Sequence, residues 1–472
     1  MSTPNRTPRT PKADRCHRSA GSGDPNVGAL MAIIAIAIIF GGGGSHYGIA
    51  NSVVLLSALF VLGFHRQAFV AFRSSASFPL RALAVLSILL PIAHLVPLPH
   101  NVWSGLPGRE MVERSFELAG GGPDNESWAA LSVDPVRTLL ALTALIVPVA
   151  VLSIGWTARR NSLVLAGWAI VGLGILQILL GVVQVLSNGE AGLLYPENPM
   201  PGALFGLFAN RNSTGLFMVG ALTLAALLPP PAQMARFEWF FRATAIVLLV
   251  LAIVLTRSRT AFVLMALPLA LAAIWFALFE MGKRRALRAD RRRVISLAIG
   301  TAFLGIAAIT ITLAGTSGRI NDTLERFETV ADDPRAYIWD DATYTVERYW
   351  PVGSGMGTFD EVFQVDESLE NMAVRRAGRA HNDHIEIAIE AGAPGLALVV
   401  GWLCLILWLV WRARSSPDRW AAWSGGSILL VIALQSITDY PLRNLSILAL
   451  GSYGLLILAR LAKPSRGRGV GS

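Results

Sequence analysis

Long apolar runs alternate with polar connections along most of this 472-residue chain. Most of these runs approach the ~20 residues that a helix needs to cross the hydrocarbon core of a bilayer. We therefore expect an all-α polytopic membrane protein with about twelve transmembrane helices. These are predicted at approximately 28–44, 49–64, 80–97, 136–155, 161–186, 211–228, 242–256, 260–279, 294–314, 393–411, 421–437 and 443–462.

The composition agrees with a membrane protein. Hydrophobic residues make up 53% of the chain and charged residues 15%, whereas a soluble domain has about 25% charged residues. The net charge of +9 need not mean nucleic-acid binding, because Lys and Arg gather in connections that a twelve-span count places on one side. That bias is typical of the cytoplasmic side, so we expect both termini to be cytoplasmic and no nucleic-acid partner.

The predicted spans divide the chain into five parts. A basic tail over 1–25, expected to be disordered, precedes helices one to nine over 26–314. A large outside loop over 315–392 follows, then helices ten to twelve over 393–462 and a second tail over 463–472. The loop contains sixteen Asp or Glu and seven Arg but no Lys. Its aromatic residues provide apolar surface, so we expect it to fold against the membrane domain.

A run of ionisable residues over 379–395 lies where this loop meets the next span. Ionisable residues near a bilayer usually mark function. Helix geometry would place His381 and His384 on adjacent turns of one face, and histidine can act as a general base near neutral pH. Glu386 and Glu390 are expected to be helix-surface or loop-pairing carboxylates, although Glu386 could also orient a histidine.

A structural histidine pair and a zinc site are the alternatives for this segment. The zinc hypothesis is weaker, because the H-E-x-x-H spacing is absent and no third ligand is evident. Cys16 lies in the polar tail and Cys404 in an apolar run, so neither a disulfide nor a cysteine–metal site is expected.

Two arginines occupy the short turn T-R-S-R-T at 256–260, between the predicted seventh and eighth spans. Arg257 and Arg259 run against the local charge bias, because this turn is predicted to lie outside. The planar guanidinium suits phosphate oxygens, which favours an anion clamp. The alternative is that both side chains reach lipid headgroups or pair with acidic residues of the loop.

Three further motifs leave both a structural and a functional interpretation open. At 210–214 a Ser or Thr could cap the predicted sixth span, or its N–H groups, with Arg211, could bind an anion. Arg335 could be a second anion or sugar contact. The alternating glycines over 353–357 require a tight, closely approached backbone, but they match neither a phosphate-binding P-loop nor a dinucleotide fingerprint.

The order of these motifs resembles the O-antigen ligase / Wzy polymerase superfamily. The motifs are T-x-S-R, R-x-x-I-W, G-x-G-x-G-x-F, and A-H-N-D-H followed by E-x-G-x-x-G. The resemblance implies a GT-C-like fold with a large periplasmic loop between helices 9 and 10, in the bacterial inner membrane. The implied catalytic residues are Arg259, Arg335 and His381. The expected substrate-binding residues are Arg211, Asn212, Arg257 and His384.

The resemblance also implies a reaction. Such an enzyme transfers a glycan from an undecaprenyl-diphosphate carrier to an acceptor hydroxyl, with no metal or other cofactor. The acceptor could be a carrier-linked glycan, a lipid A-core sugar or a protein. The rival hypothesis is a transporter or flippase for lipid-linked sugars, which would place charges near mid-bilayer and show internal repeats. The candidate residues cluster at one predicted face, which favours the enzyme.

Overall fold

The computed structural model describes residues 24–44, 47–118, 120, 128–186, 193–195, 200, 202–231, 238–284, 334–372 and 377–462. The predicted ninth span over 294–314 lies outside these residues. So do the tail over 463–472, nearly all of the tail over 1–25 and the first part of the predicted loop.

The described residues are mostly helical. The first half contains α1 (Pro25–Phe40), η1 (Gly41–Gly43), α2 (Gly48–Phe64), α3 (Arg66–Ser75), α4 (Phe78–His94), α5 (His100–Trp103), α6 (Arg109–Leu118), α7 (Pro135–Ala144), α8 (Ile146–Trp156) and α9 (Arg160–Leu186). The second half contains α10 (Arg211–Leu227), α11 (Glu238–Leu255), α12 (Arg259–Leu264), α13 (Ala266–Arg284), α16 (Pro334–Tyr349), α17 (Phe359–Phe363), α18 (Asp383–Ala413), α19 (Arg419–Gln435), η4 (Pro441–Arg443) and α20 (Leu445–Leu461).

Each predicted span that falls within the described residues coincides with helix. Six helical stretches there are long and apolar enough to cross a membrane, and the bent pair α2–α3 gives a seventh if it counts as one span. Helices α4 and α20 are also apolar but shorter, with 17 residues each. The chain is thus a mostly helical protein with several candidate spans, and the count of twelve stays a prediction.

The expectation of an all-α fold needs one correction. Strands β1 (Pro97–Pro99) and β2 (Trp128–Ala130) form a two-stranded antiparallel ribbon, with Leu98 opposite Ala129. Trp103 packs beside the ribbon and donates its indole N–H to the carbonyl of Ala130, at 2.9 Å. Three-residue strands are too short to give a periodic signal in the sequence, so this element could not be predicted.

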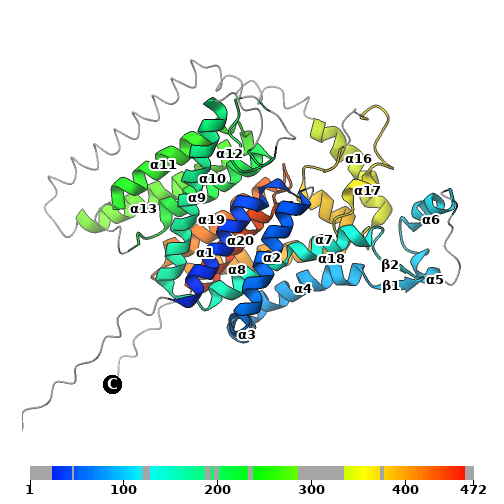
Figure 1. The fold of residues 1–472 in the computed structure, drawn as a ribbon, viewed down its shortest axis with the longest axis horizontal. Coiled ribbons are helices and arrows are strands. Elements are labelled where there is room, and N and C mark those ends of the chain that lie inside the picture. Colours follow the sequence, from blue (N-terminus) through cyan, green and yellow to red (C-terminus); the bar gives the residue numbers. More distant parts are fainter. Residues whose placement is uncertain are drawn as a thin grey trace, which may run out of the picture.

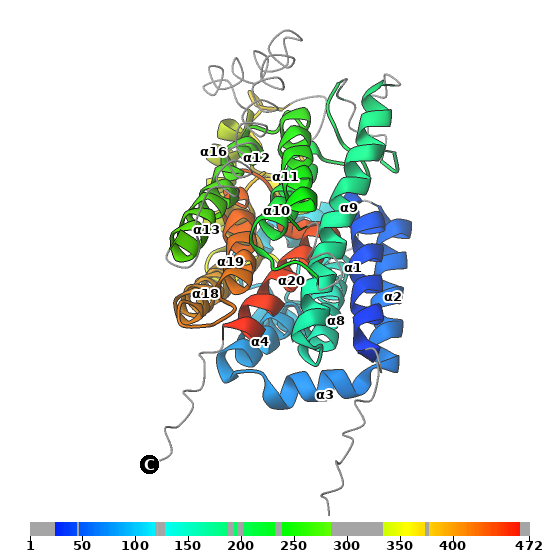
Figure 2. The same cartoon turned by 90° about the vertical axis from the view of Figure 1, so that its left-hand side faces the viewer.

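Helix α10 lies at the centre of the bundle, among α9, α11, α13, α19 and α20 (Figure 2). Every residue from Ser213 to Leu227 is buried, as expected for a helix that is apolar on all sides. Small residues allow the close approach of its neighbours: a Cβ on Gly220 would lie 2.7 Å from Leu450 of α20. The first residue of this enclosed helix therefore has a well-defined position.

The two ends of the bundle carry different elements. Helix α3 turns by 80° from α2 and lies across one end, where Phe72 and Trp156 pack with ring centroids 5.3 Å apart. Helices α12 and α16 lie at the opposite end (Figures 1 and 2). Arg66 and Arg73 lie on α3, in one of the connections that the twelve-span count places inside, and are thus separated from the elements predicted to be outside.

Helix α18 is kinked where the glycine-rich turn over 353–357 docks. Gly392 has φ 54° and ψ −143°, and Pro394 cannot donate to the carbonyl of Glu390. The carbonyls of Ile389 and Glu390 instead accept the backbone N–H groups of Ser354 and Gly355, at 2.9 and 2.8 Å. The kink and the turn therefore satisfy each other's backbone groups.

The glycines of this turn are required by both conformation and space. Gly353, Gly355 and Gly357 have φ of 93°, 116° and 88°. A Cβ on Gly353 would lie 2.4 Å from the carbonyl oxygen of Glu390, and one on Gly355 would lie 2.1 Å from Ser132 Oγ. The expectation of a tight, closely approached backbone is confirmed, and these contacts favour the structural interpretation of the motif.

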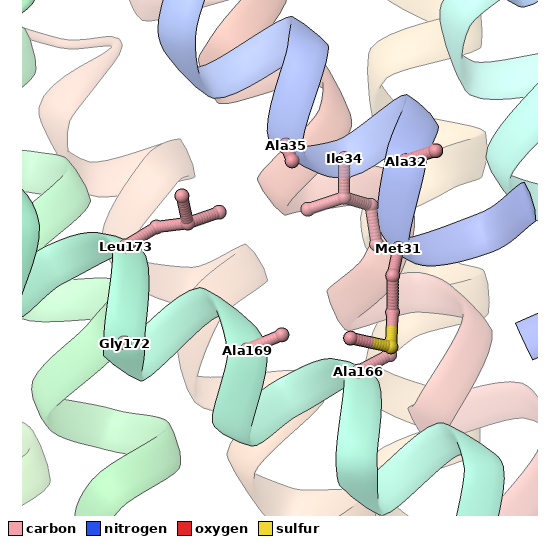
Figure 3. Close-up of a pocket in the computed structure, with 8 residues that line it drawn as sticks. All are labelled: Met31, Ala32, Ile34, Ala35, Ala166, Ala169, Gly172 and Leu173. Atoms are coloured by element: carbon pink, nitrogen blue, oxygen red, sulfur yellow. The ribbon is translucent and has the colours of Figure 1, made fainter. Parts of the chain in front are cut away.

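An apolar pocket of about 410 Å³ lies between α1 and α9. Figure 3 shows its lining by small and apolar residues, among them Met31, Ala35, Ala169 and Leu173. It contains no ionisable side chain. The groups able to carry chemistry lie elsewhere, at the end of the bundle that contains α12 and α16.

Candidate active site

His381 lies immediately before α18 and not within it. Asn382 caps the helix by accepting the N–H groups of His384 and Ile385, at 2.9 and 3.3 Å. His381 itself has φ 51°, a left-handed conformation that few non-glycine residues adopt. The prediction that His381 and His384 share one helical face is therefore wrong, because the cap separates them.

The side chain of His381 contacts a carboxylate. Its Nδ1 lies 3.2 Å from Oδ1 of Asp439, which is only 2% exposed. The ring also packs near Tyr440, with centroids 5.0 Å apart. Asp439 belongs to the link between α19 and α20, so the contact joins two segments that are 58 positions apart.

The surroundings keep Asp439 ionised. Burial alone would raise its pKa, but hydrogen bonding and charge from His381, the charge of Arg335 and a hydrogen bond from Asn212 outweigh this effect. The pKa of Asp439 therefore lies below its ordinary value. Asn210 Nδ2 also donates to Oδ2 of Asp439, at 3.4 Å.

Sequence reasoning missed Asp439. The signal was available, because Asp439 lies in the short link between the last two predicted spans and Arg443 is the first residue of the last one. Two ionisable residues so close together at a predicted membrane face could have been taken as a functional mark. Nothing in the sequence, however, indicated that this link meets the histidine segment.

The T-R-S-R-T turn adopts a second strained conformation. Arg257 has φ 55°, and it and His381 are the non-glycine residues with positive φ in the described part of the chain. Ser258 caps α12 by accepting the N–H of Ala261 at 3.3 Å, so Arg259 occupies the first position of that helix. Strained backbone of this kind clusters at functional sites.

Two contacts fix this turn near the histidine site. Thr260 and Thr438 lie with their hydroxyl oxygens 3.2 Å apart, which joins the turn to the link that contains Asp439. Gly215 of α10 allows close packing, because a Cβ there would lie 2.5 Å from Cβ of Ala261. The structure thus brings the arginine turn and the link that bears Asp439 into contact.

The start of α10 also reaches the site. The cap of this helix is Asn210, which accepts the N–H of Asn212 at 2.8 Å, and not the Ser or Thr that the sequence suggested. The carbonyl of Asn212 accepts a hydrogen bond from Gln435 of α19, at 3.2 Å. Arg211 contacts the sulfur of Met200 through Nη1.

Arg335 lies in the first turn of α16, and its charge acts on Asp439. The same helix holds the backbone before His381, since Trp339 donates its indole N–H to the carbonyl of Ala380 at 2.8 Å. His384 lies in the first turn of α18. Within the described residues its side chain makes no hydrogen bond or ion pair, so it is not part of the histidine–aspartate contact.

The carboxylates that follow are not on the helix surface. Glu386 and Glu390 are both fully buried and pair with Arg443, at 3.1 and 2.6 Å. Glu386 also pairs with Arg379 at 3.3 Å. The helix-surface alternative is therefore wrong for both residues, because both carboxylates are buried and pair with arginines that are only partly exposed. The described ranges contain no group of three or more His, Cys, Asp or Glu side chains able to hold a metal ion.

The described site therefore combines a histidine oriented by an ionised carboxylate with arginines on neighbouring elements. The sequence was compared with models of known protein families to find what such a site is used for. Residues 244–400 match the family model described as O-antigen ligase. The match covers 157 of the 472 residues, and over this range the chain is similar to the O-antigen ligase/Wzy superfamily. A search of curated proteins found no match.

The family match confirms the resemblance seen in the motifs. The matched range contains Arg257, Arg259, Arg335, His381 and His384, and it excludes Arg211, Asn212 and Asp439. The match, together with several apolar helices, makes the chain similar to a family of glycan-transferring membrane enzymes.

Proposed function

We propose that this protein is an inner-membrane glycosyltransferase. It moves a glycan from an undecaprenyl-diphosphate carrier to an acceptor hydroxyl at the periplasmic face, in surface polysaccharide polymerisation or ligation. The observation that supports this best is the His381–Asp439 contact of 3.2 Å, at the end of the bundle where α12 and α16 place Arg259 and Arg335.

His381 is the proposed general base. An ionised carboxylate can only accept hydrogen bonds, so the contact with Asp439 requires the proton of a neutral imidazole to reside on Nδ1. Nε2 then keeps its lone pair and can take the proton of the acceptor hydroxyl. A carboxylate that fixes the tautomer and orientation of a histidine has the same role in serine hydrolases.

The arginines are proposed to stabilise the leaving group. As the acceptor oxygen bonds to the anomeric carbon, the bond from that carbon to the phosphate oxygen breaks and its electron pair stays on the diphosphate. Arg259 and Arg335, with Arg257 and Arg211 in support, would stabilise this charge without a metal ion. Attack opposite the diphosphate would invert the anomeric centre.

The proposed membrane face follows from the distribution of positive charge. Arg66 and Arg73 lie on α3, at the opposite end of the bundle from α12 and α16. If α3 faces the cytoplasm, as the positive-inside rule predicts, the site faces the periplasm. There it can meet a donor whose lipid tail stays in the bilayer.

Turnover by the purified protein tests this proposal. With an undecaprenyl-diphosphate-linked oligosaccharide and an acceptor, we expect an acceptor–glycan product and an equal amount of free undecaprenyl diphosphate. Movement of the intact donor across a vesicle membrane, with no release of undecaprenyl diphosphate, would instead support a flippase. The acceptor class is tested by deletion: short repeat units accumulate without a polymerase, and unattached polymer accumulates without a ligase.

A further inference from the structure

We propose that Glu386 is a positioning residue that sets the geometry of the His381–Asp439 pair. This inference rests on the proposed function, because it assumes that His381 is the base. Within the described residues, no hydrogen bond or ion pair joins Glu386 to His381. Its carboxylate instead bonds to both segments that bring the pair together.

The first set of contacts fixes the segment before His381. Glu386 is fully buried, and its Oε1 accepts the backbone N–H of Ala380 at 3.1 Å. Its Oε2 accepts from Nη1 of Arg379 at 3.3 Å. Together with the hydrogen bond from Trp339 to the carbonyl of Ala380, these contacts hold the peptide units that precede His381.

These bonds compensate for an unfavourable backbone conformation. His381 has φ 51°, and such a conformation persists only when its surroundings determine it. If the anchor at Ala380 is weakened, the backbone at His381 can relax toward negative φ. The imidazole would then move relative to Asp439.

The second contact fixes the link that contains Asp439. Oε2 of Glu386 lies 3.1 Å from Nη2 of Arg443, which ends η4 just after Asp439. Asp383 supports the same link, since its Oδ2 accepts from Ser436 Oγ at 2.9 Å and from the N–H of Leu442 at 3.2 Å. The link is therefore held on both sides of Asp439.

Glu390 offers a matched control. It also is fully buried and also bonds Nη2 of Arg443, at 2.6 Å. Its other side-chain contact is with the N–H of Phe359 at 3.3 Å, in the segment after the glycine-rich turn. Glu386 and Glu390 thus share a residue type, burial and an arginine partner, but only Glu386 bonds the segment before His381.

The test measures the pH dependence of glycan transfer, because a simple loss of protein stability would not change it. The ionisable groups near His381 are Asp439 and Tyr440 from the link and Arg335 from α16, with Arg379 placed over the Tyr440 ring at 5.9 Å. Asp439 is an anion in contact with the imidazole. Its displacement would remove this negative charge from beside the proposed base, so the acid limb of the pH–rate profile should move to lower pH.

Glu386→Gln is the main variant, because glutamine has a similar size but its amide oxygen accepts the N–H of Ala380 more weakly than a carboxylate does, and it loses the charge that pairs with both arginines. We expect kcat to fall about 10-fold or more, with the donor KM nearly unchanged and the acid limb shifted to lower pH. Glu390→Gln should leave the acid limb in place. In an Asp439→Asn background, Glu386→Gln should cause no further shift, since both changes act through the same pair.

Two results would overturn the proposal: an unshifted acid limb in Glu386→Gln, or full additivity of its effects with those of Asp439→Asn. If Glu386→Gln does not yield monodisperse protein, Arg379→Gln tests the same anchor, and an unshifted limb there counts equally against it. His381→Ala separates the two hypotheses. Normal transfer by that variant would refute the proposed base, whereas its inactivity with an unshifted Glu386→Gln profile would refute only the positioning role.

Discussion

At the residue scale, two residues of the candidate site have an unusual backbone conformation. Arg257 and His381 both have positive φ, at 55° and 51°, and each lies directly before the residue that caps a following helix. Such conformations cost of the order of 1–3 kcal/mol each. The chain therefore accepts strain at the two positions where the arginine turn and the histidine segment enter the site.

The first prediction concerns the arginines. Arg259→Ala and Arg335→Ala should each lower transfer on the order of 10²-fold or more, because each removes a charge that we propose stabilises the leaving diphosphate. Arg→Lys should recover little, since lysine lacks the planar fork. Arg348→Ala is the matched control on α16, because Arg348 pairs with Asp366 near the far end of that helix. Near-normal transfer by a correctly inserted Arg259→Ala protein would remove this residue from the site.

The second prediction concerns Asp439. Its pKa is lowered in the folded protein, so the stability that its charge provides is present above the unfolded pKa and is lost only as the pH falls through the lower, folded pKa. Asp439 should therefore stay ionised around neutral pH. Asp439→Asn should lower kcat and move the acid limb of transfer to lower pH. A pH–rate profile with an unchanged acid limb would show that Asp439 does not act on the base.

Several residues of the candidate site could be predicted from the sequence, but the residues that contact them could not. Arg259, Arg335 and His381 stand in recognisable local motifs, so the sequence alone nominated them. Asp439 meets His381 across 58 positions, and no local pattern encodes that distance. The burial of Glu386 could not be predicted from the sequence for the same reason, because its partner Arg443 lies beyond another predicted span.

At the element scale, the decisive feature is the kink in α18. At the kink, backbone carbonyls of α18 accept N–H groups of the glycine-rich turn. This docking fixes where α16 and α17 contact α18. The positions of the apolar helices could be predicted because their signal is local. The start of α18, the bend before α3 and the β1–β2 ribbon depend on caps and distant contacts, so they could not.

The third prediction tests this docking. Gly353→Ala should destabilise the protein, because the new Cβ would lie 2.4 Å from the Glu390 carbonyl oxygen at a φ of 93°. We expect the apparent Tm in detergent to fall on the order of 5 °C. Gly378→Ala is the control, since its Cβ would meet its nearest neighbour, Asp360, at 3.5 Å. Equal melting of the two variants would mean that the turn does not need this close approach.

At the scale of the whole molecule, the proposed function requires that the site face the periplasm. The fourth prediction is that residues in the 315–392 segment face the periplasm. Ser368 donates to Asp341, so the neighbouring Leu369, which is 83% exposed, is the better position for a cysteine. After Cys16 and Cys404 are replaced, Leu369→Cys should react with an impermeant reagent in outer-membrane-permeabilised cells.

Ser74→Cys provides the opposite control, because Ser74 is exposed on α3 at the other end of the bundle. It should react only after lysis. Labelling of Ser74→Cys in outer-membrane-permeabilised cells, with Leu369→Cys protected, would invert the topology and move the site to the cytoplasm.

Glycan transfer by His381 variants tests the central claim most directly. Purified wild-type, His381→Ala and His384→Ala proteins would be given the same undecaprenyl-diphosphate-linked donor and acceptor, and product would be measured with and without EDTA. We expect His381→Ala to bind donor but lose transfer by about 10²-fold or more, His384→Ala to be milder, and EDTA to have no effect. An inactive His384→Ala beside an active His381→Ala would reverse the roles, and normal transfer by both variants would contradict the histidine mechanism.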